Sequence, residues 1–209
     1  MKTLAIISRK GGAGKTTIAL HLAVAAELHG LATAVFDLDP QASAAIWSDH
    51  RGEPSPAVVP AQAPRLPALL GQARKQEADL AILDTAPHAD AIASEAAAHA
   101  DLILIPCRPS SFDLDAIGAS IRLARAAERP AVVVINAAPV QGVETGEAVD
   151  AIASAGVEVC PVVLHQRKPY ASRIHEGRTA TEIEPKGKAA QETRDLLLWV
   201  CDKLILLPK

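Results

Sequence analysis

The feature that most constrains this chain is a glycine-rich stretch near its start, SRKGGAGKTT at residues 8–17. It follows a short apolar run, TLAIIS at residues 3–8, which is typical of a buried strand. It leads into TTIALHLAVAAELHG at residues 16–30, whose apolar residues recur near helical spacing. A strand, a glycine loop and a helix start therefore follow in order. This arrangement turns backbone N–H groups and the positive end of a helix toward an anion such as phosphate.

The second half of this stretch carries phosphate-binding chemistry. Gly14, Lys15 and Thr16 match the end of the pattern G-x-x-x-x-G-K-[ST], in which the lysine reaches the β- and γ-phosphates and the hydroxyl holds Mg²⁺. The first glycine of that pattern would fall at position 9, where the chain has Arg9, so the pair Gly11–Gly12 must form the tight turn. The alternative is a purely structural glycine turn. The stretch predicts a nucleotide-phosphate loop and leaves a second lysine, at position 10, without a role.

Further apolar runs of strand type alternate with helical patterns along the chain. We expect strands at residues 3–8, 33–39, 80–84, 102–107, 131–136 and 157–164, and helices at residues 16–30, 66–76, 89–99, 113–128, 144–155 and 187–206. This alternation predicts an α/β chain, a single-domain three-layer P-loop NTPase fold over residues 1–209, with a mostly parallel sheet and helices on both faces. Residues 51–67 hold five prolines and are expected to form a surface connection, with an edge strand at residues 57–59 at most.

Composition narrows the class of partner and the compartment. A net charge of −3 gives no overall attraction to nucleic acid, and 2% aromatic residues argue against a surface that stacks single-stranded bases. Any nucleic-acid surface must therefore be a local patch. Cys107, Cys160 and Cys201 are widely spaced without C-x-x-C spacing, so we expect buried thiols in a reducing cytoplasm. The N-terminus leads straight into a strand without a signal segment, which also predicts a cytoplasmic protein.

Three aspartates follow predicted strands. Asp37 and Asp39 come after the second strand and Asp84 after the third. An isolated aspartate at such a place is most often a helix cap or a solvated loop carboxylate. In open α/β sheets, however, ligands bind beyond the carboxyl ends of the strands. We therefore expect these three carboxylates to converge on the phosphate loop.

Four stretches together resemble one protein family. They are KGGAGKTT (10–17), DLDPQ (37–41), LAILDTAP (80–87) and PCRPSSFDL (106–114). Their order and approximate spacing are similar to those of the ParA/MinD group of deviant Walker ATPases. The resemblance covers nearly the whole chain, including a basic tail at residues 165–192. It looks closest to the short, ParF-like ParA proteins of plasmid partition, which lack an N-terminal helix-turn-helix domain.

The resemblance implies roles for the loop residues, with ATP and Mg²⁺ as cofactors. Lys10 matches the family's signature lysine, which reaches across a nucleotide-sandwich dimer to the phosphates of the other subunit, so an ATP-dependent homodimer is expected. The alternative is a solvated lysine. Lys15 would neutralise β/γ oxygens, Thr16 would bind Mg²⁺ and Thr17 would bond an α-phosphate oxygen. The backbone N–H groups expected to cradle the phosphates belong to Gly11, Gly12, Ala13 and Gly14.

The resemblance also implies roles for residues at the strand ends. Asp84 matches the Walker B position and would hold a Mg²⁺-bound water, with help from Asp37. Asp39 matches the residue that orients the attacking water in a weak, partner-stimulated hydrolysis of ATP, and it could also cap a helix starting near residues 40–41. Asn136 stands where the family often has an adenine-contacting residue, although a turn-forming asparagine explains it nearly as well.

Partition ATPases of this family bind DNA non-specifically as ATP dimers, and a ParB-like or small centromere-binding partner stimulates hydrolysis and release. A local basic patch would be the corresponding feature here, which would make the protein nucleoid-associated. Residues 165–188 contain six basic and three acidic side chains, which gives a local excess of positive charge. The alternative to a DNA-binding patch is an ordinary solvated loop. The basic residues are Arg167, Lys168, Arg173, Arg178, Lys186 and Lys188, and the acidic ones are Glu176, Glu182 and Glu184.

Other functions of the same family stay open. A MinD-like division regulator would use a terminal amphipathic helix on a membrane. Here the terminal residues Leu197, Val200, Leu204 and Leu207 make a core-facing stripe with few cations opposite, so no stable membrane association is expected. A nucleoid-bound ATPase that positions a protein cargo would share every residue named above. A metabolic P-loop enzyme, such as a ligase or a nitrogenase-reductase-like protein, is the remaining alternative.

Overall fold

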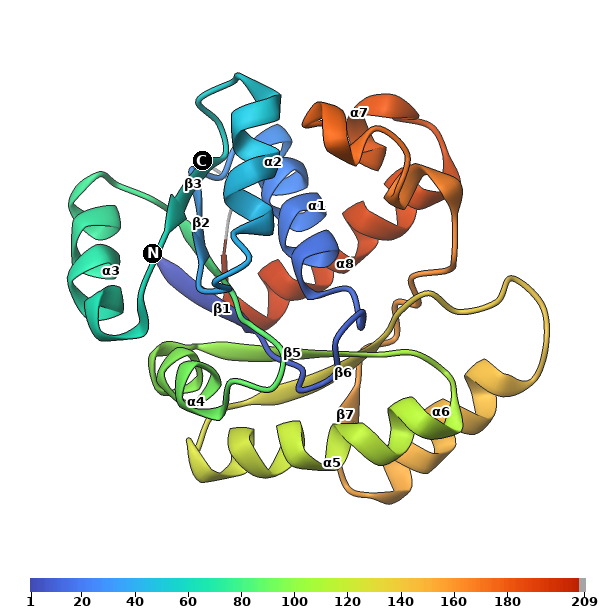
Figure 1. Ribbon diagram of the computed structural model, residues 1–209. Helices are drawn as coiled ribbons and strands as arrows, with labels where there is room; N and C mark the ends of the chain where they lie inside the picture. Colours follow the sequence, from blue (N-terminus) through green and yellow to red (C-terminus); the bar gives the residue numbers. More distant parts are fainter. Residues whose placement is uncertain (207–209) are drawn as a thin grey trace.

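The computed structural model of the protein describes residues 1–206. Its strands form one sheet in the order β3-β2-β4-β1-β5-β6-β7, and every neighbouring pair is parallel (Figure 1). The strands are β1 (Lys2–Ile6), β2 (Thr33–Asp37), β3 (Ala57–Pro60), β4 (Leu80–Asp84), β5 (Leu102–Cys107), β6 (Ala131–Ile135) and β7 (Glu158–Val159). β1 lies between β4 and β5. The loop after β1 is therefore at the point in the sheet where ligands of α/β folds usually bind.

Helices cover both faces of this sheet. One face carries α1 (Lys15–Leu28), α2 (Ser43–Arg51), α7 (Ala180–Ile183) and α8 (Lys188–Leu204). The other carries α3 (Leu66–Lys75), α4 (Asp90–His99), α5 (Ser111–Ala126) and α6 (Glu144–Ser154). Short 3₁₀ helices occur at Ala63–Arg65, Lys168–Tyr170 and Ile174–Glu176. The predicted three-layer P-loop NTPase fold is thus confirmed.

Two hydrophobic cores explain why the strands are apolar throughout. Leu4 and Ile6 of β1 pack in the core under α1 and α8, whereas Ala5 and Ile7 pack in the core on the opposite face. All four residues are buried. Because successive side chains of a strand point to opposite faces, a sheet covered on both sides needs an apolar residue at every position.

The edges of the sheet differ in how well they follow the sequence pattern. β3 pairs only with β2 among the described strands, which confirms the expected edge strand at residues 57–59. At the other edge, the strand expected at residues 157–164 is wrong in length, because only Glu158–Val159 form a ladder. The Cys160 N–H still donates to the Val133 carbonyl at 2.8 Å, but Pro161 follows and has no N–H to continue the ladder.

The terminal helix packs on the domain. Leu197, Val200 and Leu204 of α8 are buried in the core beside α1, as the apolar stripe predicts. Leu207, the last residue of the predicted stripe, lies outside the described residues. Within residues 1–206, none of the helices has the length and apolar character needed to cross a membrane.

The cysteines are buried and free. Cys107, Cys160 and Cys201 form no disulfide, which fits the prediction of buried thiols. Burial raises the pKa of the Cys107 thiol to about 12 and that of Cys160 to about 11. Because the thiolate is the reactive form, these side chains are core residues without nucleophilic character at neutral pH.

Candidate nucleotide-binding site

The loop between β1 and α1 has a backbone that only glycine accommodates at its last position. Gly14 precedes α1 with φ 97°, in the left-handed region, and Gly12 has φ 73°. A Cβ atom on Gly14 would lie 2.2 Å from the Asn136 amide nitrogen. Within the described chain, the N-terminus of α1 has no side-chain cap and no acidic residue in its first turn. Its first N–H groups are therefore oriented for an anionic ligand.

The two lysines of the loop have different surroundings. Lys15 is 6% exposed, and its Nζ lies 3.5 Å from the carbonyl oxygen of Lys10. Burial lowers the pKa of Lys15, while the negative charges of Asp84 and Asp39 oppose that shift. Lys10 is turned instead toward α5, where its Nζ lies 2.6 Å from Oδ2 of the buried Asp113. Lys15 thus points into the loop, and Lys10 is held by another element of the same chain.

Asp37 joins two parts of the site. Its Oδ2 accepts hydrogen bonds from the N–H groups of Ala44 at 2.9 Å and Ala45 at 3.0 Å, and its Oδ1 accepts one from Asp39 N–H at 3.1 Å. Asp37 therefore caps the first turn of α2 from outside the helix. Burial raises its pKa, although these backbone N–H groups oppose the shift.

Asp84 is the buried carboxylate of the site. It is 0% exposed, and neither of its carboxylate oxygens has a hydrogen bond of ordinary geometry to any described residue. Burial raises its pKa to about 7; the charge of Asp37 adds to the shift, whereas the nearby Thr16 hydroxyl and Lys15 oppose it. A buried, unpaired carboxylate beside a threonine hydroxyl is costly unless a ligand completes it. These two side chains therefore suit a hydrated Mg²⁺.

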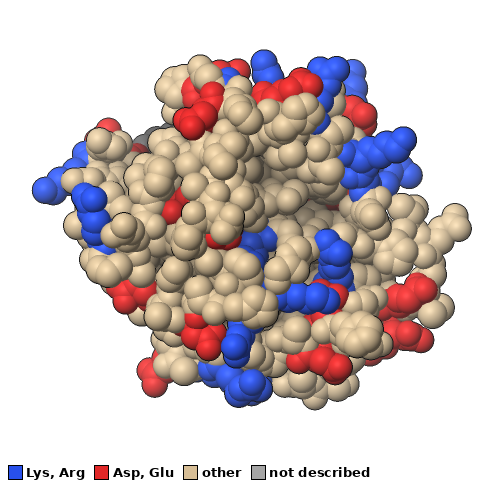
Figure 2. Space-filling model, in the orientation of Figure 1, with Lys and Arg blue, Asp and Glu red and all other residues tan. Residues whose placement is uncertain are grey.

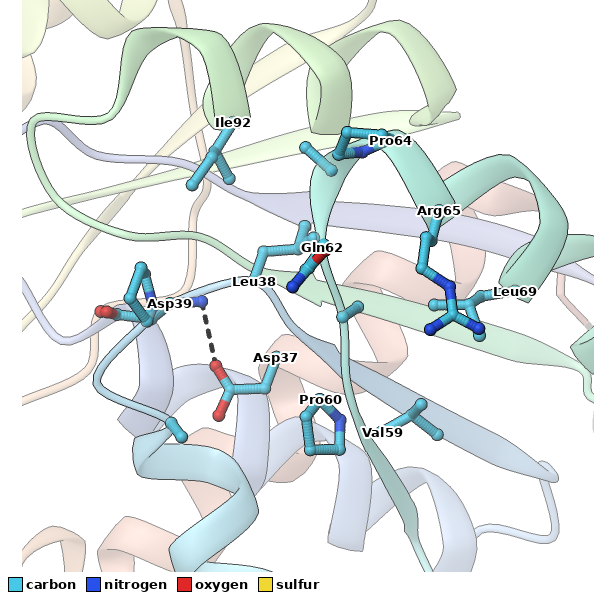
Figure 3. A pocket seen from close by; sticks show the side chains of 14 residues that line it. Asp37, Leu38, Asp39, Val59, Pro60, Gln62, Pro64, Arg65, Leu69 and Ile92 are labelled. Atoms are coloured by element: carbon cyan, nitrogen blue, oxygen red, sulfur yellow. Dashed lines mark hydrogen bonds between the residues drawn. The ribbon is translucent and has the colours of Figure 1, made fainter.

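Asp39 lines a cavity of about 770 Å³. Figure 3 shows Asp37 and Asp39 at one end of this cavity and Arg65 and Leu69 at the other. Asp39 Oδ1 accepts a hydrogen bond from Gln41 N–H at 2.9 Å, so it stabilises a turn before α2. The helix cap that the sequence allowed for Asp39 is supplied by Asp37, and α2 begins at Ser43, later than expected.

Asn136 contacts the phosphate loop directly. Its Nδ2 donates a hydrogen bond to the carbonyl oxygen of Ala13 at 2.7 Å. The side chain thereby fixes the loop at the position where Gly14 leaves no room for a Cβ atom. A contact of Asn136 with adenine stays a prediction, and it would use Oδ1 or replace this hydrogen bond.

The basic residues of the tail divide into paired and unpaired groups. Arg167 donates from Nε at 2.9 Å and from Nη2 at 2.7 Å to Glu192, and its side chain is 18% exposed. Arg178 lies 3.6 Å from Glu53 and 3.7 Å from Glu182. The exposed residues that form no ion pair within residues 1–206 are Lys168, Lys186 and Lys188, while Arg173 pairs weakly with Glu176 at 3.8 Å. In Figure 2, basic side chains gather near α7, at the upper right edge of the molecule.

No role is assigned from the sequence to two residues near the site, Asp113 and Arg51. Asp113 could have been found from the run S-x-x-D at residues 110–113, because Ser110 caps α5 and donates to the Asp113 carboxylate at 2.5 Å. Arg51 has no local signal, since its partners Gly177 and Glu182 are distant in sequence.

A family model described as "CobQ/CobB/MinD/ParA nucleotide binding domain" matches residues 4–180. The chain belongs to this family. It is therefore a ParA/MinD-family nucleotide-binding domain, as the four sequence stretches indicate. The match spans the phosphate loop, all three aspartates and Asn136.

Known relatives of this ParA/MinD-family domain match over nearly its whole length. The chain is 28% identical over 204 residues to "Maintenance of carboxysome distribution protein A" of Halothiobacillus neapolitanus, covering 94% of each protein. The ATP complex of an aspartate-to-alanine variant of Cyanothece McdA has a TM-score of 0.80 at 20% identity, and the match covers 99% of this chain and 97% of that one. The septum site-determining protein MinD of Pyrococcus horikoshii with Mg-ADP has a TM-score of 0.75 at 19% identity, with 95% of both chains covered. The two solved structures share the fold.

Proposed function

We propose that this protein is a ParA-type ATPase that dimerises with ATP, binds DNA non-specifically and is released when a partner stimulates hydrolysis. The observation that carries the proposal is the separate placement of the two loop lysines. Lys15 points into the loop beside Asp84, whereas Lys10 has a side chain 37% exposed and paired with Asp113 on α5. Lys10 makes its side-chain contact outside the phosphate loop. This placement supports a role for Lys10 at the nucleotide of a second subunit.

ATP and Mg²⁺ fit the residues of the site. The backbone of residues 11–14 and the N-terminus of α1 would hold the phosphates, with Lys15 neutralising them. Within the described chain, no cluster of three or more His, Cys, Asp or Glu side chains could hold a metal ion. Thr16 with the unpaired Asp84, assisted by Asp37, would therefore hold Mg²⁺ together with phosphate oxygens and water. Bound Mg²⁺-ATP supplies the phosphoryl group and the charge that draws the subunits together.

The remaining residues act on water and on the second subunit. Asp39 stands beside an open cavity and would orient the attacking water. Lys10 would leave Asp113 and reach the phosphates bound in the other subunit, where a cation stabilises charge on the transferred group. Dimerisation thus depends on bound ATP, and hydrolysis dissolves the dimer.

Dimerisation is tested by light scattering with a non-hydrolysable ATP analogue and Mg²⁺. We expect the mass to double, Lys10→Ala to remain monomeric while still binding the analogue, and Lys15→Gln to lose analogue binding. A wild-type protein that stays monomeric at saturating analogue and micromolar concentration would contradict the proposal.

The role of Asp39 is tested by Asp39→Ala. This variant should dimerise with ATP and dissociate slowly, because water positioning is lost while Lys15, Thr16 and the aspartates at positions 37 and 84 are intact. Normal ATP turnover by Asp39→Ala would show that another group orients the water.

The cargo has two candidate classes. The ParA resemblance favours segregation of plasmid or chromosomal DNA through a ParB-like or small centromere-binding partner. Similarity over 94% of the length of a carboxysome-distribution protein favours a protein assembly positioned on the nucleoid. Pull-down with the ATP-bound dimer, using the product of the neighbouring gene as prey, separates them: the first expects a DNA-binding partner and the second a component of a protein assembly.

A membrane-cycling function is the further alternative. The buried stripe of α8 argues against it, because Leu197, Val200 and Leu204 already pack in the core. ATP-bound protein that floats with anionic vesicles and ignores duplex DNA at low salt would favour the membrane instead.

A further inference from the structure

One helix connects the aspartates of the nucleotide site to the basic tail. α2 begins where the Asp37 carboxylate accepts hydrogen bonds from Ala44 and Ala45, and it ends at Arg51. Its N-cap residue, Ala42, has φ 53° and offers no side-chain cap. The position of the first turn of α2 therefore depends on Asp37, the same carboxylate that fixes the Asp39 backbone. Nine residues of helix span about 14 Å from end to end.

The other end of α2 is fastened by the guanidinium of Arg51. Its side chain is 6% exposed. Nη1 donates to the Gly177 carbonyl at 2.9 Å and to Glu182 Oε2 at 3.1 Å, while Nη2 lies 2.9 Å from Glu182 Oε1. Nε donates to the Ser55 carbonyl at 2.8 Å, and the group lies 5.2 Å from the Trp47 ring centre. This is a planar two-pronged contact with a carboxylate that is itself only 13% exposed.

The acidic partner of Arg51 is held in its charged form. Burial alone would raise the pKa of Glu182, but hydrogen bonds from Arg51 and Thr179 outweigh it, so the pKa lies below the usual value. Glu182 also completes a capping box with Thr179 at the start of α7. One carboxylate thus joins α2 to α7 and to the segment that precedes it.

Backbone contact makes this connection stiff. Gly177 has φ 72°, and a Cβ atom there would lie 2.2 Å from the Arg51 Cα atom. No side chain separates the two backbones, so α2 cannot shift without moving Gly177. The exposed cations Arg173 and Arg178 flank this glycine. We call residues 173–178 the basic segment.

We propose that Arg51 couples the nucleotide site to the basic segment, so that a change at Asp37 is carried by α2 to Gly177 and sets the position of the two flanking arginines. Mg²⁺-nucleotide held at Thr16 and Asp84 would draw on the same Asp37 carboxylate that accepts hydrogen bonds from Asp39, Ala44 and Ala45, and would thereby shift the first turn of α2. Arg51 is a positioning residue, since it touches neither the loop nor its ligand. Coupling of this kind needs a contiguous element with two arrangements that both sites bias.

Hydrogen exchange tests the coupling without any DNA. In the wild type, a non-hydrolysable ATP analogue with Mg²⁺ should protect the loop at residues 10–17 and change exchange rates several-fold at residues 171–178. In Arg51→Gln the loop should still be protected, but the change at residues 171–178 should disappear. An unchanged response of residues 171–178 in Arg51→Gln, or none in the wild type with a protected loop, would overturn the proposal.

Other variants separate coupling from loss of stability. Gly177→Ala keeps every charge but forces the two backbones apart, and Glu182→Gln keeps the shape of the carboxylate, so both should lose the remote response. They also serve if Arg51→Gln does not fold. Lys203→Gln is the matched control, because it removes an ion pair with Glu158 at 2.5 Å far from α2. The control should keep the full response.

The consequence for DNA rests on the proposed function. Wild-type protein should bind duplex DNA more tightly with the analogue than with ADP. Arg51→Gln should lower the ratio of the two dissociation constants to the part that dimerisation alone gives. By linkage, DNA should raise the affinity for the analogue relative to that for ADP by the same factor in the wild type. If wild-type protein shows the exchange response but binds no DNA, the DNA-binding proposal fails and the coupling stands. A ratio unchanged by Arg51→Gln refutes the coupling.

Discussion

Lys10 and Lys15 belong to the same loop, but their side chains have different contacts. The Lys10–Asp113 pair joins a half-exposed ammonium to a carboxylate with a side chain 6% exposed, at 2.6 Å. Breaking this pair to move Lys10 elsewhere leaves Asp113 without its cation, which costs free energy. Asp113 therefore opposes any use of Lys10 in a second subunit until phosphates offer a stronger attraction. It sets a threshold for dimerisation.

Asp113→Asn should lower that threshold. Because the amide carries no charge, Lys10 is released at a smaller cost, and the analogue-bound dimer should form at roughly five- to tenfold lower protein concentration, equivalent to about 1 kcal/mol. Sedimentation over a concentration series measures this. Asp115→Asn, an exposed carboxylate on the same helix, is the control and should change nothing. A weaker dimer in Asp113→Asn would mean that Asp113 aids the assembled state.

Asp84 makes the stability of the nucleotide-free protein depend on pH. Its folded-state pKa is raised to about 7, from an ordinary value of 3.8. Between these values the folded state binds more protons than the unfolded state. Stability from this group is therefore fully present below about pH 4 and is lost as the pH rises through 7. Burial makes the ionised Asp84 carboxylate energetically unfavourable, and a bound Mg²⁺ would offset that cost.

Asp84→Asn should remove this pH dependence. Without nucleotide at pH 8, the variant should melt at least about 2 °C above the wild type, because position 84 then carries no buried charge. At pH 4.5, close to the ordinary pKa of 3.8, the difference in melting temperature should be several-fold smaller than at pH 8. The variant should also lose Mg²⁺-dependent nucleotide binding, measured by calorimetry. A variant less stable than the wild type at pH 8 would mean that the ionised carboxylate has a partner in the folded protein.

At the scale of elements, the loop between β1 and α1 depends on one glycine and the side chain beside it. Gly14→Ala meets two obstacles, a φ of 97° and a Cβ atom 2.2 Å from Asn136 Nδ2. We expect a loss of about 2–3 kcal/mol of stability and of nucleotide binding. Denaturant unfolding measures the loss of stability. Combining Gly14→Ala with Asn136→Ala in one chain then separates the steric clash from the backbone strain. The double variant should recover only the steric part, since the backbone strain remains; full recovery would mean that φ strain is negligible.

Elements with a local signal were predictable from the sequence, and those fixed by distant contacts were not. The buried strands β1, β2, β4, β5 and β6 have continuous apolar runs, and the phosphate loop has its own spacing. The start of α2 was misplaced because its cap comes from Asp37, before the intervening turn. The 3₁₀ helices at Lys168–Tyr170 and Ile174–Glu176 were missed because their segment is held by Arg51 and by Glu192, far away in sequence. α7 was missed although its capping box, Thr179 with Glu182, is a local signal. No local pattern encodes the distant partners.

At the scale of the whole molecule, charge pairing decides which cations can meet a large anionic partner. The overall charge of −3 makes a basic patch necessary for DNA, and counting six cations in the tail overstates that patch. Arg167 is bound to Glu192, and burial and hydrogen bonding give it a structural role beside His165 and Tyr170. Lys186 and Lys188, at the start of α8, have no ion pair within residues 1–206.

This distinction yields a prediction for DNA binding by the ATP-bound dimer. Affinity from phosphate contacts falls with salt by a slope of about 0.9 per contact. Four lysine contacts in the dimer alone mean that raising salt from 50 to 200 mM should weaken wild-type binding about a hundredfold or more. Lys186→Ala with Lys188→Ala removes up to two contacts per subunit, and a dimer doubles the loss, so the slope should fall by roughly 3 to 4. The loss should be equal for unrelated duplex sequences, because phosphate contacts carry no sequence information. Fluorescence anisotropy over a salt series measures both quantities.

Arg167→Ala is the opposing case in the same assay. Its guanidinium neutralises Glu192 in a half-buried cluster, so its removal should cost stability of about 1–3 kcal/mol while leaving the salt slope of the folded dimer nearly unchanged. We therefore expect the paired Arg167 to affect stability and the unpaired Lys186 and Lys188 to affect the salt slope, although these residues are close together in sequence. If Arg167→Ala lowered the slope as much as the lysine pair did, the pairing with Glu192 would have to open on DNA. A slope insensitive to both changes would place the DNA surface on another face of the molecule.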